Sequence, residues 1–496
     1  MRPVPKGRHL KANIVLWWLR RDLRLHDNLA LQAALATGAK VLPVFVLDPS
    51  LLCSKRMGLP RLKFMLAGLA ALGESLRELG GELLIQQGEP RTVLSQVVRS
   101  VGAAAVYANC DYTPFAVQRD RSVANALEVP LHLFDDAMVH PPGQTLKADG
   151  SPFVVYSPYK RQWLVLPKPE VVSYSIREGQ LHHLPGIERQ PMPTLADLGF
   201  GSTINVPVAG EAEAARRLAR FTGGAVFDYS VQRDILAVDP FADGGEGAAS
   251  GLSPYFRFGM LSPRQAYHAA QSARSAAASA SQRESVDAWI SELAWRDFYM
   301  HILFHFPRVH NSSFRPEYEQ VAFREAPEEL KAWQEGRTGY PVVDAAMRQL
   351  NSIGWMHNRA RMIVASFLTK DLLIYWREGE AFFMKQLIDG DPAANNGGWQ
   401  WSAGTGTDAQ PYFRIFNPVS QSKKFDPQGS YIRRWLPELQ AVPDAFIHEP
   451  WTMESPPKDY PPRIVDHPMA RERALAAFRA VKKGTPVDRA RPSRSS

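Results

Sequence analysis

Two charged residues stand among tryptophans in the segment DAWISELAWRDFYM, which spans residues 287–300. Glu292 and Arg296 are four residues apart, which places them on one face of a helix. Trp289 and Trp295 flank Glu292 at a distance of three residues on either side. A glutamate on a semi-buried face needs hydrogen-bond partners. Glu292 therefore indicates a polar ligand or a pairing with Arg296, whereas core packing explains only the indoles.

A second polar face lies in GWMHNRARMIVASF, residues 354–367. Asn358, Arg361 and Met362 share one face of the expected helix, and Arg359 lies one step around it. An amide and two guanidinium groups in an otherwise apolar helix favour a polar ligand against that face. A pair of buried salt bridges is the alternative.

Asp389 and Asp391, in IDGDPAANNGG, are the carboxylates that such salt bridges would use. An Asp-x-Asp pair also occurs at metal sites. No histidine or third acid follows at ligand spacing, so we predict no metal site.

The segment NNGGWQW, residues 395–401, is the least generic part of the chain. Asn-Gly and Gly-Gly steps break a helix and allow the backbone to approach a planar ligand closely. Trp399 and Trp401 would lie about 200° apart on a helix, so one can face a cofactor and the other a second aromatic partner. Arginines and lysines then alternate with aromatics in PYFRIFNP, SKKF and YIRRWLPEL, as on a nucleic-acid-binding surface.

Two Ser-Pro steps predict helix starts, with Ser253 and Ser262 at the N-cap and Pro254 and Pro263 at the first helical position. The small residues 247–251 before the first step would let backbone N–H groups approach a phosphate. Two ordinary helix caps are the plainer interpretation.

The elements that must position these residues fall into two classes. Short apolar runs at 13–19, 41–47, 82–88 and 104–110 alternate with helical patterns, which is typical of a parallel sheet. We therefore predict an α/β domain over residues 10–140. It contains neither GxGxxG nor GxxxxGK[ST], so an ordinary dinucleotide or P-loop phosphate site is not indicated.

Residues 141–210 hold ten prolines and predict a long connector on the surface. Residues 211–480 follow helical patterns, best over 284–306 and 342–376. The last residues, 484–496, predict a loose basic tail.

The charge balance narrows the class of partner. The 496 residues carry 58 Lys and Arg against 50 Asp and Glu, a net charge of +8. That excess suits a polyanion or simply a soluble basic surface. Two cysteines cannot form a disulfide framework, and no run reaches about 18 apolar residues. We expect a cytoplasmic protein with neither signal peptide nor membrane span.

Seven segments taken together resemble the photolyase/cryptochrome family of blue-light flavoproteins, and most closely its class I cyclobutane pyrimidine dimer photolyases. They are WLRRDLRLHDN (18–28), YSPYKRQW (156–163), SGLSPYFRFGMLSPRQ (250–265), ELAWRDFY (292–299), GYPVVDAAMRQLNSIGWMHNRARM (339–362), YWREGE (375–380) and DGDPAANNGGWQWSAGTGTD (389–408). The ordered series covers residues 12–445, so it is far more specific than any one motif.

The resemblance implies an α/β antenna-binding domain with a parallel sheet, joined by a long connector to an all-α FAD-binding domain. It implies FAD that is reduced in the active form, with Asn395 beside the reactive N5 nitrogen and Arg361 paired with Asp389. The positions that match the family's FAD contacts are Tyr229, Ala249, Ser250, Gly251, Leu252, Ser253, Arg361, Asp389, Gly390, Asp391 and Asn395.

The implied substrate is UV-damaged DNA. Excited reduced FAD would pass an electron to a pyrimidine dimer flipped out of the helix, the cyclobutane ring would split, and the electron would return. The positions that match the family's DNA and lesion contacts are Arg233, Glu292, Trp295, Arg296, Tyr299, Asn358, Arg359, Met362 and Trp401.

One departure concerns the chain of three tryptophans with which the family photoreduces oxidised flavin. Trp399 and Trp376 match the first and middle members, but Phe323 stands at the distal position. Phenylalanine is much harder to oxidise. We therefore expect slower or rerouted photoreduction, with Tyr375 or another Tyr or Trp as the replacement, and intact repair.

A second departure concerns the antenna. DYTPFAVQRD (111–120) lacks the Asn-Glu pair that folate-binding members carry in this segment. The second chromophore is left open among deazaflavin, flavin, folate or none.

We expect the protein to be a monomer. Two other functions are alternatives to the repair of cyclobutane pyrimidine dimers. One is a cryptochrome-like blue-light photoreceptor, which Asn395 and the short tail disfavour. The other is a photolyase for (6-4) photoproducts, a branch that usually has histidines where this chain has Asn358 and Met362.

Overall fold

The computed structural model describes residues 14–182, 192–201, 204–241 and 249–483. The predicted basic tail and residues 247–248 of the predicted phosphate segment lie outside this part of the chain. The chain divides into two compact units. The first unit comprises residues 1–307, 350–355 and 383–395, and the second unit comprises 308–349, 356–382 and 396–496. The first unit thus groups the first helices of the helical region with the sheet, and the domain limits expected from the sequence remain a prediction.

A parallel sheet forms one end of the first unit, as predicted. Its strands in the described residues are β1 Ile14–Leu19, β2 Lys40–Leu47, β3 Leu84–Gln87, β4 Val106–Asn109 and β5 Leu131–Phe134. They pair in the order β3-β2-β1-β4-β5. The order reverses between β1 and β4, so the carboxyl ends of these strands border a crevice suited to a ligand. The sequence does not predict β5, because none of its four residues is fully buried.

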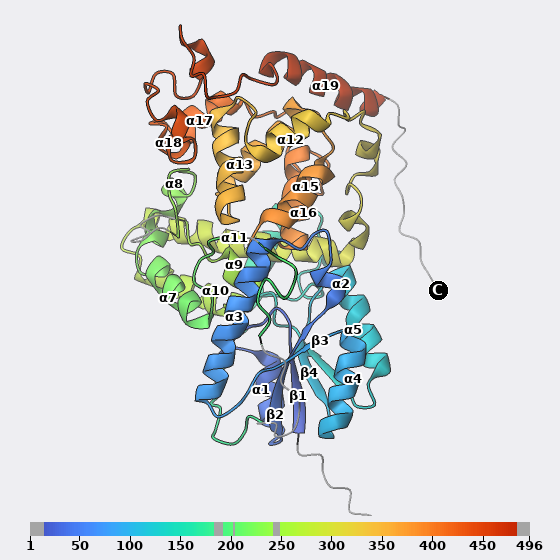
Figure 1. The fold of residues 1–496 in the computed structure, drawn as a ribbon. Helices are drawn as coiled ribbons and strands as arrows, with labels where there is room; N and C mark the ends of the chain where they lie inside the picture. Colours follow the sequence, from blue (N-terminus) through green and yellow to red (C-terminus); the bar gives the residue numbers. More distant parts are fainter. Residues whose placement is uncertain (1–13, 183–191, 202–203, 242–248, 484–496) are drawn as a thin grey trace, which may run out of the picture. The chain divides into compact units, whose positions relative to one another are not determined.

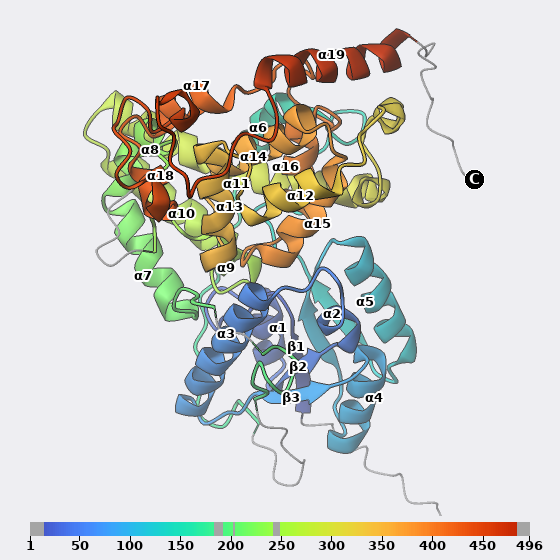
Figure 2. The same cartoon turned by 45° about the horizontal axis from the view of Figure 1, so that its top comes forward.

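Helices flank the sheet on both sides, with α3 on one side and α4 and α5 on the other (Figures 1 and 2). Further helices of the first unit follow the connector. The first-unit helices are α1 Leu29–Ala36, α2 Pro49–Leu52, α3 Leu59–Glu78, α4 Pro90–Val101, α5 Pro114–Ala126, α6 Tyr156–Val165, α7 Glu211–Thr222, α8 Tyr229–Gln232, α9 Ser253–Arg257, α10 Pro263–Ala276 and α11 Ala280–His305. Helix α6 lies inside the proline-rich connector and is not predicted from the sequence.

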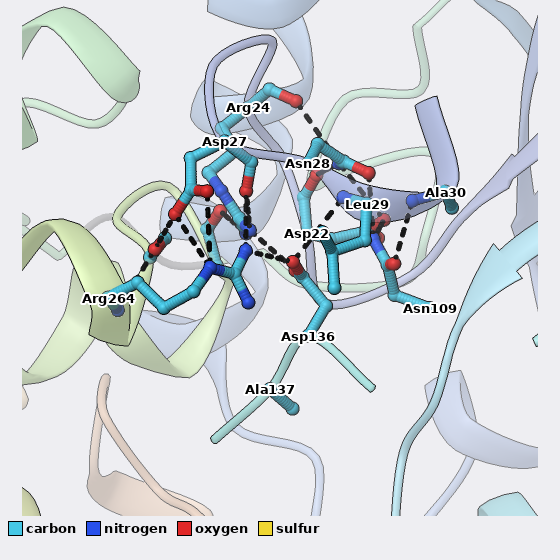
Figure 3. Close-up of polar contacts among 12 residues, drawn as sticks. Asp22, Arg24, Asp27, Asn28, Leu29, Ala30, Asn109, Asp136, Ala137 and Arg264 are labelled. Atoms are coloured by element: carbon cyan, nitrogen blue, oxygen red, sulfur yellow. Dashed lines mark hydrogen bonds and ion pairs between the residues drawn. The ribbon is translucent and has the colours of Figure 1, made fainter. Parts of the chain in front are cut away.

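Buried ion pairs tie the loop after β1 to the start of α10 (Figure 3). Arg264 donates Nε to both carboxylate oxygens of Asp27 at 3.1 Å and Nη2 to Asp136 at 2.6 Å. Arg24 pairs with the other oxygen of Asp136. Removing one member would leave a buried charge without its partner, which typically costs about 3–5 kcal/mol. The motif WLRRDLRLHDN therefore fixes the position of the start of α10.

The helices after α11 interrupt the long helix predicted over 342–376. In the described residues they are α12 Pro327–Glu335, α13 Pro341–Ile353, α14 Asn358–Ser366, α15 Trp376–Gln386, α16 Pro392–Ala403, α17 Pro418–Phe425, α18 Ser430–Trp435 and α19 His467–Lys483. The prediction is wrong because α13 ends before Gly354, which has φ +68°, and a π-helical turn, Phe367–Asp371, follows α14. Only glycine adopts that φ without strain.

The predicted helix break at Asn395–Gly398 is also wrong, because these residues lie within α16. Asp391 caps the helix by accepting the N–H groups of Ala393 and Ala394 at 2.9 and 3.1 Å. Each glycine inside a helix destabilises it by about 1 kcal/mol. The N-cap at Asp391 and the burial of the Trp399 indole stabilise α16 enough to offset this cost.

Candidate functional site

Glu292 pairs with Arg233 in the first unit. Arg233 Nη1 lies 2.7 Å from Glu292 Oε1, and about a third of each side chain is exposed. The Arg233 guanidinium also lies 5.1 Å from the ring centroid of Tyr229. The pair therefore joins α8, where Tyr229 begins the helix, to α11. A charged pair that is partly open to solvent can still reach a polar ligand.

Arg296, the alternative partner of Glu292, points elsewhere. Its Nη1 donates to the backbone oxygen of Ala137 at 2.6 Å, and its guanidinium lies 5.6 Å from the ring of Phe256. It lines a pocket at the carboxyl ends of β1 and β4, together with Arg20, Arg21, Asn109 and Asp111.

Trp295 lies on α11, one helical turn after Ser291. Its side chain is half-buried. Its indole stacks on the ring of Tyr156, with centroids 3.5 Å apart and planes 10° apart. Tyr299 lies 5.4 Å away at a tilt of 32°. The structure thus places three predicted lesion residues, Glu292, Trp295 and Tyr299, within two turns of one helix, beside a tyrosine that the sequence analysis does not assign to the site.

The segment at 249–253 leads into a helix, as predicted, but the N-cap residue differs from the predicted one. Leu252, not Ser253, is the N-cap of α9, and no side chain caps this helix. The prediction for Ser253 is wrong because the helix begins one residue earlier, at Ser253 itself. Ser262, in contrast, caps α10 with a full capping box, as predicted. Gly251 has φ +63°, and a Cβ there would lie 3.0 Å from Pro240. The Ser253 side chain is exposed, so its hydroxyl is available to a ligand.

Asp391 is held by arginines of the first unit. Its Oδ2 lies 2.5 Å from Arg21 Nη2 and 4.0 Å from Arg257 Nη1, and Arg257 Nε donates to the Gly390 oxygen at 2.7 Å. Burial opposes ionisation of Asp391, but Arg21, Arg257 and the helical N–H groups outweigh it and lower its pKa well below the usual range. The carboxylate therefore stays charged and accepts hydrogen bonds at any physiological pH.

Asn395 follows Asp391 on the first turn of α16. Its backbone N–H donates to the Asp391 oxygen at 2.9 Å, and the residue is buried. Asp389 is buried as well. Residues 389–395 thus carry two carboxylates and a neutral amide, the acceptors and donors that sugar hydroxyls and ring N–H groups require.

Trp399 and Trp376, both predicted electron carriers, are buried in the second unit. Trp399 packs edge-on against Trp333, with centroids 6.0 Å apart. A Cβ on Gly379 would lie 2.0 Å from the Trp399 ring. Gly379 is three residues after Trp376 and shares its face of α15. The absence of a side chain at Gly379 therefore leaves room on α15 for the Trp399 ring.

Phe323 occupies the predicted distal position and packs against Tyr375, with centroids 5.2 Å apart. Tyr375 in turn lies 5.8 Å from Trp376. The Tyr375 hydroxyl donates to Glu319 Oε2 at 2.8 Å. Burial opposes ionisation of Glu319, but hydrogen bonds from Ser313 and Tyr375 lower its pKa. An oxidisable phenol thus stands next to a carboxylate that can take its proton.

The second polar face lies on α14 of the second unit. Asn358 is exposed, whereas Arg359, Arg361 and Met362 are half-buried. The Arg359 guanidinium lies 4.5 Å from the ring of Phe425, and Arg361 Nε donates to the Met356 oxygen at 2.9 Å. Trp401 is half-buried, unlike Trp399, so the two indoles of NNGGWQW have different surroundings.

Neither a cluster of metal ligands nor a membrane-spanning helix occurs in the described residues. No three His, Cys, Asp or Glu side chains there gather as metal ligands. No helix in this part of the chain combines the length and the apolar character needed to cross a bilayer.

Comparison with known proteins decides the family. Residues 15–173 match the family model described as DNA photolyase, and residues 289–480 match the FAD binding domain of DNA photolyase. A deoxyribodipyrimidine photo-lyase of Synechococcus is 41% identical over 96% of this chain and 99% of its own length. This chain belongs to the DNA photolyase family.

Solved photolyases share the fold. A class III photolyase of Agrobacterium tumefaciens has a TM-score of 0.84 at 36% identity and covers 96% of this chain and 99% of its own. A photolyase of Sulfolobus tokodaii, solved with two FAD molecules, has a TM-score of 0.80 at 30% identity and covers 94% and 100%. These matches confirm the predicted family, fold class and FAD-binding helical region.

Sequence reasoning missed several residues of this photolyase that contact its predicted site residues. Arg21 and Arg257 hold Asp391, Glu319 accepts from Tyr375, and Tyr156 stacks on Trp295. Three of the four lie in motifs quoted for the resemblance, but nothing in their local spacing shows which distant residue each one meets. The exception is Glu319, which lies in no quoted motif.

Proposed function

We propose that this photolyase repairs UV-damaged DNA by splitting cyclobutane pyrimidine dimers under blue light. Its near-full-length relative in Synechococcus is named a deoxyribodipyrimidine photo-lyase. The observation that carries the proposal is the cluster of Glu292, Arg233 and Trp295. A half-buried indole beside a partly open carboxylate offers stacking and a hydrogen bond to one flipped, apolar lesion.

The residues present fit FAD. A left-handed Gly251 and the exposed Ser253 suit a diphosphate, because backbone N–H groups and a hydroxyl can approach it without a side chain in the way. Charged Asp391 and the neutral amide of Asn395 suit the hydroxyls and ring nitrogens of the cofactor. The chemistry that reduced FAD supplies, once bound and excited by light, is a reversible electron transfer to the dimer.

The protein's own part in repair is to bind and orient the lesion. Trp295 offers an apolar face, and Glu292 is held in place by Arg233 so that its free oxygen can bond the pyrimidine edge. Basic side chains bind the phosphates without regard to sequence. The lesion is favoured because a damaged base pair costs less to unstack than an intact one.

The test is repair of a defined lesion. An oligonucleotide with one thymine dimer is incubated with reduced protein under violet light and in the dark, and intact thymines are counted by chromatography. We expect repair in the light only. Repair of a (6-4) product instead, or no repair of either lesion by FAD-loaded protein, would overturn the proposal, and the latter result would favour a photoreceptor.

We also propose a place for a second chromophore. The pocket with Arg20, Arg21, Asn109 and Asp111 lies at the carboxyl ends of β1 and β4, where the strand order reverses. The Sulfolobus tokodaii photolyase carries two FAD molecules. Extraction of purified protein followed by chromatography identifies the second chromophore, and a single FAD per chain would argue against this site.

We propose further that the protein acts in the cytoplasm as a monomer. Light scattering after gel filtration, with and without a lesion duplex, tests the oligomeric state.

A further inference from the structure

Helix α6 turns part of the connector into a support for α11. Its buried aromatic residues, Tyr156, Tyr159 and Trp163, recur at spacings of three and four and so share one face. Tyr159 packs against Phe298 and His301, each with ring centroids 5.1 Å away. Tyr159 therefore packs on the helix that carries Trp295, whereas the Trp163 ring also meets Tyr267 of α10, with centroids 5.7 Å apart.

Two further contacts fix α6. Trp163 Nε1 donates to Asp297 Oδ2 at 3.0 Å, and the same oxygen accepts the Val139 N–H at 3.0 Å. Lys168 Nζ donates to the backbone oxygens of Trp163 and Leu166 at 2.6 and 2.7 Å. This lysine satisfies carbonyl groups that a helix end leaves without partners. Tyr156 thus projects from a helix that is anchored at its other end.

Tyr156 contacts α11 through both its ring and its hydroxyl group. Its ring lies flat on the Trp295 indole at 3.5 Å, and its hydroxyl donates to the Ser291 oxygen at 2.7 Å. Ser291 is one helical turn before Trp295, so the ring spans that turn. Phe298 meets the edge of the same tyrosine at 5.7 Å. The indole cannot turn about its side-chain bonds without losing the stack.

We propose that Tyr156 is a positioning residue that holds the Trp295 indole ready to stack against the pyrimidine dimer. The inference rests on the proposed function, because it takes Trp295 as a lesion contact. An indole already held in one orientation loses less conformational freedom when a ligand stacks on it, and binding is correspondingly tighter. The connector helix therefore sets how strongly the protein prefers damaged DNA.

The effect should be selective. Contacts to phosphate depend on basic side chains elsewhere and are the same for damaged and intact DNA. Loss of the Tyr156 ring should weaken binding to a dimer about three- to tenfold, the range expected for one aromatic pair, and leave binding to intact DNA unchanged. Loss of the hydroxyl alone keeps the stack and should change dimer binding less than about twofold.

The experiment uses FAD-loaded protein and measures dark binding by fluorescence anisotropy at one salt concentration. The probes are a thymine-dimer duplex and its undamaged twin. The variants are Tyr156→Leu, Tyr156→Phe and the matched control Tyr159→Leu, which removes a ring from the same helix that does not contact Trp295. Repair per absorbed photon at saturating protein is measured in parallel and should equal that of the wild type for every variant.

The outcomes separate the two ideas. A wild-type protein with no preference for the dimer contradicts the proposed function. A wild-type preference that survives Tyr156→Leu, or that Tyr156→Phe or Tyr159→Leu reduces as much, overturns the positioning role. If Tyr156→Leu loses FAD, Tyr156→Met takes its place, since it keeps the buried volume without a flat ring.

Discussion

At the scale of single residues, Tyr375 and Phe323 lie where we expect electrons to leave the protein. The buried Trp376 contacts Tyr375, and Tyr375 contacts Phe323. Loss of an electron makes a phenol strongly acidic, so a tyrosine is a good donor only where a base can accept its proton. Glu319 is within hydrogen-bond distance for that purpose.

We predict that Tyr375→Phe slows photoreduction of the oxidised protein severalfold, whereas Phe323→Trp speeds it by restoring an indole at the distal position. Bleaching of the flavin absorption under blue light with a thiol donor measures the rate. Repair by chemically reduced protein should be the same in both variants. If neither substitution changes the photoreduction rate, electrons leave by another route.

At the scale of elements, helix packing depends on where glycine stands. Gly379 on α15 and Gly398 on α16 are both helical, but only Gly379 faces another side chain within 4 Å. The two residues therefore make a matched pair for separating helix propensity from packing.

We predict that Gly379→Ala destabilises the protein by about 1–3 kcal/mol, because its Cβ would overlap the Trp399 ring. Gly398→Ala should be neutral or stabilise the protein by up to about 1 kcal/mol, since alanine favours a helix. Thermal unfolding of the two variants beside the wild type measures both effects. Equal stability of the two variants would mean that Trp399 does not pack as described.

The junction of α6 and α11 predicts a pH dependence. Burial raises the pKa of Asp297 to about 6, even though Arg296 and hydrogen bonds from Trp163 and the backbone oppose that rise. The folded state thus binds this proton more tightly than the unfolded state does. The associated stability is fully present below about pH 4 and is lost as the pH rises through about 6.

Asp297→Asn should remove that component. We expect the stability difference between variant and wild type to shift in the variant's favour between pH 5 and 7.5, by up to about 2 kcal/mol. Urea unfolding at both pH values measures the shift. A difference that does not change with pH would show that Asp297 is already ionised at pH 5.

At the scale of the whole molecule, the net charge of +8 governs encounter with DNA. Phosphate contacts release counterions, so affinity falls linearly with salt on logarithmic axes. The lesion contacts that we propose for Glu292 and Trp295 involve no phosphate and should be insensitive to salt.

We therefore predict equal salt slopes for dimer-containing and intact duplexes, with a constant offset between the two lines that reports lesion recognition. Binding titrations from 50 to 300 mM salt measure both quantities. A steeper slope for the dimer would mean that lesion binding recruits additional basic residues. In that case the preference for the dimer would come mainly from phosphate contacts made when the dimer is flipped out, and not from stacking alone.

The sequence by itself determined the class of each region and the family. Alternating apolar runs specify a parallel sheet because strands buried on both faces have no polar face to display. Ordered motifs specify a photolyase because so many residues of defined type rarely recur by chance. The same motifs predict Asp391, Asn395, Glu292 and Trp295 as site residues, since each lies in one of them.

Only the tertiary structure decided which residues meet. Arg21 pairs with Asp391, which is 370 residues away in the sequence. Tyr156 stacks on Trp295 from a helix in the connector, and the high proline content of the connector does not predict that helix. Local spacing reports which face of an element a residue occupies, but not what packs against that face. The partner is chosen by burial and charge compensation over the whole fold, and these depend on contacts that are distant in sequence.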